Sequence, residues 1–290
     1  LLRCAGLDTL ATIRINGSQI AKTDNMYRTY EFNVKKLLHV GENTLDIELA
    51  APLPYTLKLD AEKREMVGWV AGMRLTTGAW IRKEPCNFGW DWGPMLPTSG
   101  IWRDIDLIGI GQARIDDLHI TQTHSDNHVT VTVALGITPH QKDPVTAVVS
   151  LARDGLTIID TKRVTFDGDS SDVTFEIENP ALWYPNGMGK QPLYEILVGV
   201  FDRDLNSLDH TSLRFGLRVI QLERHDDEWG ESFYFSCNGV PFFAKGANWI
   251  PASPFAGQTS PKEYRKLLQA AKDANMNMMI EMMAKGPLTN

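Results

Sequence analysis

Apolar and polar residues alternate along the N-terminal part of the chain, from about residue 8 to residue 49. The alternation is clearest in two sets of residues: Tyr30, Phe32 and Val34, then Leu45, Ile47 and Leu49. Between residues 12 and 20, the dipeptide Asn16-Gly17 interrupts an apolar run, which is the strongest short-range signal for a β-hairpin. Alternation with period two, bounded by turn residues, predicts half-buried antiparallel strands of a β-sandwich or jelly roll.

The pattern changes over residues 51–79. Two prolines end the last strand, and a stretch of mixed charge over residues 57–67 predicts a short helix. Glycines at positions 68, 72 and 78 then mark an irregular connection, and such a connection inside a compact domain is usually functional or disordered. The apolar residues Ile101, Ile105 and Leu107 predict the strand that closes this first domain.

A second series of short strands spans residues 113–223. Apolar residues alternate cleanly from Val129 to Leu135, and further strands are predicted over residues 145–151, 173–177, 194–201 and 213–220. Short strands at regular spacing, joined by Asp-Gly and Pro-Asn-Gly turns, predict an immunoglobulin-like sandwich. No pair of cysteines has the spacing of an antibody domain, so the pattern indicates only the architecture.

The period of the pattern changes again after residue 224. A hairpin is predicted around Asn238-Gly239, and residues 242–247 read as a buried strand. Ser260 and Glu263 then form a capping box with proline at the first helical position, and apolar residues at helical spacing predict a helix over residues 261–274. Residues 275–280 predict another strand. A strand, a helix and a strand form a βαβ unit, which normally continues as a parallel sheet or barrel.

Composition narrows the class of protein. A length of 290 residues suits two domains with part of a third, and we expect boundaries that give domains over 1–111, 112–223 and 224–290. The net charge of −7 argues against nucleic acid or an anionic membrane as a partner. No apolar run approaches the length that spans a bilayer. The cysteines, Cys4, Cys86 and Cys237, are widely separated and odd in number, so we expect buried thiols and neither a disulfide framework nor a zinc site.

The run from Asn87 to Pro94 carries the clearest candidate chemistry. Within it, the carboxylate of Asp91 lies between the indoles of Trp90 and Trp92, with a glycine on either side. Flat aromatic faces can cover the apolar side of a sugar ring, and a fixed carboxylate can accept hydrogen bonds from its hydroxyls. The same residues also suit a buried turn in which the indoles belong to a core and the carboxylate caps backbone amides. From this run alone both interpretations stay open.

Other polar residues give weaker signals. The adjacent carboxylates Asp116-Asp117 and Asp226-Asp227 should point to opposite faces of an extended chain, so we expect solvated charges there. The histidines His124, His128 and His140 should lie at the surface of the second sandwich and not bind metal. No Ser-His-Asp arrangement, phosphate-binding glycine loop or metal cluster can be argued from the sequence.

Three runs in order resemble glycoside hydrolase family 2 and, within it, the β-mannosidases. The first is Ile81–Pro94 followed by Gly100–Asp104, the second is Asn179–Gly187, and the third is Asn238–Pro251. The resemblance covers most of the chain. It implies a mainly β fold with a galactose-binding-like jelly-roll sandwich and an immunoglobulin-like sandwich. The first strand, helix and strand of an incomplete (β/α)₈ barrel, which typically has ~250 residues, would follow.

The resemblance also implies a sugar-binding site. A loop of the first domain would reach over the barrel mouth and lend the Asp91 carboxylate to the terminal sugar subsite, with Trp90 and Trp92 shaping its wall. Chemistry in such barrels lies at the carboxyl ends of the strands. Asn248 and Trp249 would follow the first strand, at the rim, where the tryptophan either stacks on a sugar or packs under a loop. The expected substrate-binding residues are therefore Trp90, Asp91, Trp92, Asn248 and Trp249.

The resemblance implies a retaining hydrolase of terminal, non-reducing β-mannosyl residues that needs no cofactor and no metal. Its two catalytic glutamates would lie on later barrel strands, so we expect no catalytic residue in these 290 residues and no turnover by this chain alone. The tail over residues 279–290 departs from the family pattern, and the chain also begins abruptly, which indicates a fragment. The alternatives are a non-catalytic carbohydrate-binding module, another family 2 specificity, such as β-galactosidase or β-glucuronidase, or a structural sandwich protein of a larger assembly whose tryptophans serve only as core. The sequence leaves the cellular compartment and the oligomeric state open.

Overall fold

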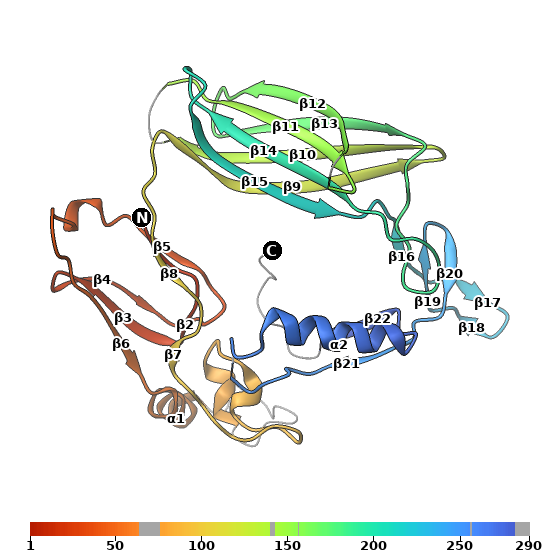
Figure 1. Ribbon diagram of the computed structural model, residues 1–290. Coiled ribbons are helices and arrows are strands. Elements are labelled where there is room, and N and C mark those ends of the chain that lie inside the picture. Colours follow the sequence, from red (N-terminus) through yellow and green to blue (C-terminus); the bar gives the residue numbers. More distant parts are fainter. Residues whose placement is uncertain (64–75, 140–142, 156, 256, 282–290) are drawn as a thin grey trace. The chain divides into compact units, whose positions relative to one another are not determined.

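The computed structural model of the chain describes residues 1–63, 76–139, 143–155, 157–255 and 257–281. The chain divides into two compact units, whose elements are labelled in Figure 1. One unit comprises Leu1–Gly109 with Asn248–Gln269 and the stretch that begins at Ile280, and the other comprises Ile110–Ala247 with Ala270–Met279. The three-domain division stays a prediction, because grouping by contact does not show which segments fold independently. In the described ranges no helix combines the length and apolar character that crossing a bilayer would need.

The first unit contains a β-sandwich built from short antiparallel strands. These are β1 (Leu2–Cys4), β2 (Leu7–Asp8), β3 (Leu10–Ile15), β4 (Ser18–Thr23), β5 (Tyr30–Phe32), β6 (Leu45–Ala50), β7 (Gly100–Ile101) and β8 (Ile105–Leu107). They pair in the orders β5-β1-β8, β4-β3-β6 and β2-β7. The core comprises Leu2, Cys4, Leu7, Ala11, Ile13, Ile15 and Val34. Every second residue of β3 is buried, as the alternating pattern predicts.

The predicted hairpin at Asn16-Gly17 is confirmed. Asn16 and Gly17 both have positive φ angles, 49° and 79°, as a type I′ turn requires. This turn joins β3 to β4, and β6 pairs on the other side of β3. The predicted closing strand is divided into two strands, β7 and β8, and the residues between them, 102–104, are not in a strand.

The predicted helix begins earlier than the charge pattern indicated. The helix α1 spans Pro52–Lys63, so both of its prolines lie in the first turn, where a missing amide proton costs no intrahelical hydrogen bond. Short 3₁₀ turns follow at Thr76–Trp80 and Pro85–Asn87. The glycines at positions 68 and 72 lie outside the described residues.

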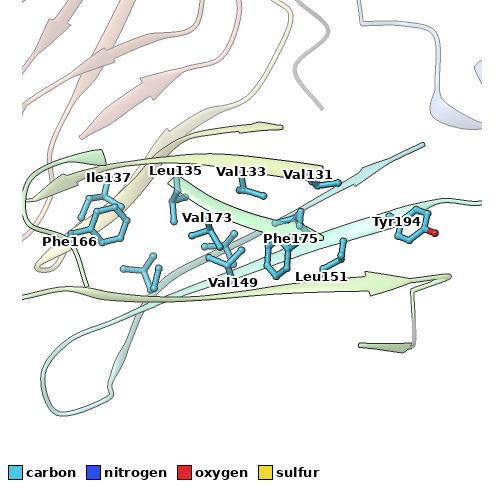
Figure 2. Close-up of a cluster of buried hydrophobic side chains, with 14 of the residues drawn as sticks. Val131, Val133, Leu135, Ile137, Val149, Leu151, Phe166, Val173, Phe175 and Tyr194 are labelled. Atoms are coloured by element: carbon cyan, nitrogen blue, oxygen red, sulfur yellow. The ribbon is translucent and has the colours of Figure 1, made fainter. Parts of the chain in front are cut away.

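The second unit contains a sandwich of two antiparallel sheets. Its strands are β9 (Ala113–Ser125), β10 (His128–Pro139), β11 (Thr146–Arg153), β12 (Thr157–Thr165), β13 (Ser170–Glu178), β14 (Tyr194–Phe201) and β15 (Ser207–Phe215). One sheet has the order β13-β10-β9 and the other β12-β11-β14-β15, which is the immunoglobulin-like architecture. Figure 2 shows side chains of β10 and β13 packed with those of β11 and β14. Burying one such aliphatic side chain completely contributes about 1.5–3 kcal/mol to the stability of the fold.

The remaining strands do not belong to that sandwich. The strands β16 (Ile220–Glu223), β19 (Tyr234–Cys237) and β20 (Val240–Phe242) form one sheet, and β17 (Asp226–Asp227) pairs with β18 (Gly230–Glu231). The strand β21 (Gly246–Trp249) pairs with β22 (Met278–Glu281), and the helix α2 (Pro261–Asp273) connects them. The tail beyond residue 281 lies outside the described residues.

The position of one predicted strand is wrong. Residues 242–247 were expected to form a buried strand, but Phe242 ends the hairpin strand β20 opposite Phe235, and the next strand begins at Gly246. The residues of β21 are mostly exposed. A Cβ atom at Gly246 would lie 2.0 Å from the Met278 carbonyl oxygen, so glycine is required where β21 meets β22.

Candidate functional site

The run that carries the candidate chemistry forms a hairpin-like loop, which we call the motif loop (residues 87–96). The Leu96 amide donates to the Asn87 carbonyl at 2.8 Å, and Phe88 and Met95 form an antiparallel bridge. Nearer the tip, the Trp90 amide donates to the Gly93 carbonyl at 3.3 Å. Asp91 and Trp92 lie between these two residues, so the structure places them together at the tip.

Phe88 anchors the stem of the motif loop. Its ring is fully buried, and it packs against Gly78, where a Cβ atom would lie 2.6 Å from the ring. Gly89 follows with φ of +91°, a conformation that L-residues rarely adopt, and the chain turns outward there. The aromatic residue of the motif that belongs to a core is therefore Phe88.

The tip of the loop faces solvent. The side chain of Asp91 is exposed, whereas Trp90 and Trp92 are half-buried. Neither indole is fully buried, so the alternative of a buried turn with both indoles in a core does not describe this loop. Two partly accessible aromatic faces and an accessible carboxylate on one short turn suit the binding of a polyhydroxylated ring.

A buried polar cluster lies at the base of the motif loop. The Lys83 ammonium donates to the Asp8 carboxylate and, at 3.2 Å, to the Thr98 hydroxyl, which itself donates to the same carboxylate oxygen at 3.2 Å. The other carboxylate oxygen accepts from the hydroxyl of Thr9. The side chains of Lys83 and Asp8 are 0% and 7% exposed. Burial lowers the pKa of Lys83, while the adjacent Asp8 carboxylate opposes this shift.

Asn248 and Trp249 occupy the last two positions of β21 and do not follow the strand as expected. Successive side chains of a strand point to opposite faces, so the two residues cannot share one surface of the strand. The Trp249 ring stacks on Tyr264 of α2, with ring centroids 6.2 Å apart and planes inclined by 25°. Asn248 is exposed. Its side chain is thus directed away from α2.

Two contacts hold the segment after β21 against the first sandwich. The buried Asn87 amide donates to the Pro254 carbonyl at 2.6 Å. Gly257 has φ of +82°, and a Cβ atom there would lie 2.8 Å from the Trp102 carbonyl oxygen. The residue that joins the motif loop to this segment is therefore Asn87, which sequence reasoning placed in the motif but not among the substrate-binding residues.

The second resembling run, Asn179–Gly187, forms a structural junction. The Trp183 carbonyl accepts from the Asn238 amide at 3.1 Å. The Asn186 amide donates to the carbonyls of Lys272 and Met276 at 3.0 and 3.1 Å, where it satisfies groups at the end of α2. Because these side-chain amides already donate to backbone carbonyls, we assign this run no binding role.

Several other charged groups that the sequence singles out have local partners. Asp116 lies in the strand β9, where its carboxylate forms an ion pair with Arg114 at 2.5 Å. His128 lies on β10 between Glu178 at 3.0 Å and Glu176. Glu263 accepts from Ser260 in the predicted capping box, which lowers its pKa. His140 lies outside the described residues. Across the described ranges, no group of three or more histidine, cysteine or acidic residues is placed to hold a metal ion.

All three cysteines are free and buried, as the sequence predicts. Burial raises the pKa of the Cys4 and Cys237 thiols, so neither is suited to act as a nucleophile near neutral pH.

Two family models match the chain. The model described as the galactose-binding domain-like domain of glycosyl hydrolase 2 matches residues 1–103, and the model of glycosyl hydrolases family 2 matches residues 113–218. Together they span well over half of the chain. Both matches coincide with the two sandwiches, and the first contains the motif loop.

Individual relatives agree with these models. The chain is 34% identical to β-mannosidase B of Emericella nidulans over 269 residues, which cover 91% of this chain and 31% of the relative. It superposes on the crystal structure of a β-D-mannosidase from Dictyoglomus thermophilum with a TM-score of 0.88 and 35% identity, covering 96% of this chain and 34% of the other. A putative β-galactosidase from Bacteroides fragilis has a TM-score of 0.69 at 18% identity, which shows the shared fold alone.

The chain spans about a third of the length of these β-mannosidase relatives. Its two sandwiches, the motif loop inserted before the last strands of the first sandwich, and the matched family models all agree. The chain therefore belongs to glycoside hydrolase family 2 and is β-mannosidase-like within it.

Proposed function

We propose that this chain is the sugar-holding part of a retaining β-mannosidase-like enzyme that removes terminal, non-reducing β-mannosyl residues. The observation that carries the proposal is that Asp91 is exposed at the tip of a loop whose base is buried. The chain that holds this loop is similar along 96% of its length to a β-D-mannosidase structure. Asp91 accepts hydrogen bonds from sugar hydroxyls, and Trp90 and Trp92 cover the apolar side of the ring.

The bond-breaking residues are two glutamates outside these 290 residues. In a retaining glycosidase they lie ~5–5.5 Å apart, one acting as acid and base and the other as nucleophile. Glu263 is not one of them, because its carboxylate accepts hydrogen bonds from the amide and the hydroxyl of the capping residue Ser260. This chain then supplies binding energy and orientation to a reaction completed elsewhere in the protein.

Asn248 and Trp249 have different parts in this proposal. The exposed Asn248 amide is free to face the sugar from the end of the first barrel strand. Trp249 supports that strand by stacking on Tyr264. Asn87 holds the segment after the strand against the motif loop through its bond to Pro254.

Hydrolysis of three chromogenic substrates by the full-length protein tests the proposal. We expect turnover of the β-mannoside to exceed that of the matching β-galactoside and β-glucuronide, and the first product detected by NMR to be the β-anomer, as retention requires. The separately expressed 290-residue chain should show no turnover above a denatured control.

Preference for another glycoside would contradict the mannoside assignment, and an α-anomer as first product would contradict retention. Mannose binding by the full-length protein without any turnover would indicate a carbohydrate-binding module instead.

A further inference from the structure

The buried cluster at the base of the motif loop connects both ends of that loop to one carboxylate. Lys83 precedes the loop and Thr98 follows it, and both contact the same oxygen of Asp8. Asp8 ends β2 and pairs with Gly100 of β7, so it belongs to the sandwich framework and not to the loop. A single framework residue therefore contacts the chain just before the loop and just after it, in addition to the anchors at Asn87 and Phe88.

Stability alone does not account for a buried ion pair at this place. Removing two charges from water costs about as much as their attraction returns, and apolar residues of similar volume are often as stable or more stable. What an ion pair adds is a defined geometry, because the hydrogen-bond directions of the ammonium and the carboxylate must both be met. Lys83 meets this condition with two acceptors, Asp8 and Thr98.

The position of the loop tip depends on the position of the two chain segments at its base. Above Lys83 and Thr98, the stem is held by the Leu96 to Asn87 hydrogen bond and by the bridge of Phe88 with Met95. The Trp90 to Gly93 hydrogen bond at the tip is longer, at 3.3 Å. A shift of the two ends relative to each other would therefore displace Asp91.

We propose that Lys83 and Asp8 are positioning residues for Asp91. By joining both ends of the motif loop, they hold the exposed carboxylate in the place where it meets the sugar, without touching the sugar themselves. The inference rests on the proposed function of Asp91. The competing explanation is that the pair only stabilises the sandwich.

The paired substitution Asp8→Asn with Lys83→Met is the main variant. It removes both charges at similar volume, whereas either single change leaves an unpaired buried charge that threatens folding. Thr98→Val is the milder variant, because it deletes only the hydroxyl that bridges the loop end to Asp8. Ile13→Ala is the matched control, since it opens a cavity in the same sandwich core, away from the loop.

Steady-state kinetics of the full-length protein on a β-mannoside separate positioning from stability. The paired variant should lose on the order of 10- to 100-fold in kcat/KM, the scale expected for a displaced binding group, and Thr98→Val should lose less. When Asp91→Ala is already present, the paired substitution should cost less than about threefold more, because its effect passes through Asp91. Ile13→Ala should lower Tm and leave kcat/KM unchanged.

Amide hydrogen exchange tests the same inference without any substrate. The amides of Trp90 and Leu96 should exchange at least about tenfold faster in the paired variant, while the paired strands β3 and β4 keep their protection. Unchanged exchange at these two amides, or an undiminished kinetic loss in the Asp91→Ala background, would overturn the inference. A wild-type protein inactive on β-mannosides would refute the proposed function instead, and exchange would still decide whether the cluster orders the loop.

Discussion

A carboxylate that binds a sugar must be accessible and also held in place. In this chain the two requirements fall on different residues: Asp91 is exposed at the loop tip, while Lys83 and Asn87 are buried beneath it. The sequence could predict Asp91, because a carboxylate between two indoles is distinctive. It could not predict that Lys83 meets Asp8, because no local pattern links residues 75 positions apart.

His128 provides a prediction about pH at the residue scale. The hydrogen bonds that the His128 ring donates to Glu176 and Glu178 raise the pKa of His128, and the hydrogen bonds that Glu176 accepts from the Thr130 hydroxyl and from His128 lower the pKa of Glu176. A raised histidine pKa stabilises the fold below about 6.5, and this contribution is lost as pH rises through the folded-state pKa. The contribution from Glu176 is present above its ordinary pKa and is lost as pH falls through the lowered one.

Thermal denaturation of His128→Gln tests whether His128 stabilises the fold more at low pH than at high pH. The variant should melt below the wild type at pH 5.5, and the difference should shrink as pH rises past the raised pKa of His128. His119→Gln on the adjacent strand β9 is the control. A difference that grows with pH, or one equal to that of the control, would contradict the assigned partners.

At the scale of elements, sequence patterns succeeded where a local rule decides the structure. The hairpin of β3 and β4, the strand β14 and the helix α2 follow from a turn dipeptide, a run of alternation and a capping box. The strand β12 was missed because all but one of its residues are exposed, so its sequence carries no alternation of apolar and polar positions. The start of β21 was misplaced because pairing with β22, a tertiary contact, decides it.

The helix α2 gives a prediction about capping. The Ser260 hydroxyl accepts from the Glu263 amide at 3.3 Å and donates to its carboxylate at 2.7 Å. Ser260→Ala should therefore lower the free energy of unfolding by about 0.5–2 kcal/mol and speed amide hydrogen exchange in the first turn of α2. Ser207→Ala, at the exposed start of β15, serves as the control. Equal denaturation midpoints for both variants would show that the cap contributes nothing.

At the scale of the whole molecule, the third predicted domain is shared between the two compact units. Asn248–Gln269 group with the first sandwich and Ala270–Met279 with the second. The motif loop and the segment after β21 thus belong to one unit, joined by Asn87 and Pro254. The resemblance of three runs predicts the family, but only the fold separates the first run, which carries the loop, from the second, which is a structural junction.

The activity of Asp91→Ala in the full-length protein tests the central claim most directly. Loss of hydrogen bonds between a charged group and the sugar should cost about 1.5–3 kcal/mol, which lowers kcat/KM for a β-mannoside on the order of 10- to 100-fold. Because Asp91 is exposed, Tm should not change. Asp104→Ala, which removes an exposed carboxylate outside the motif loop, should leave both quantities unchanged. An unchanged kcat/KM together with a lower Tm for Asp91→Ala would show that the turn is structural and would contradict the account.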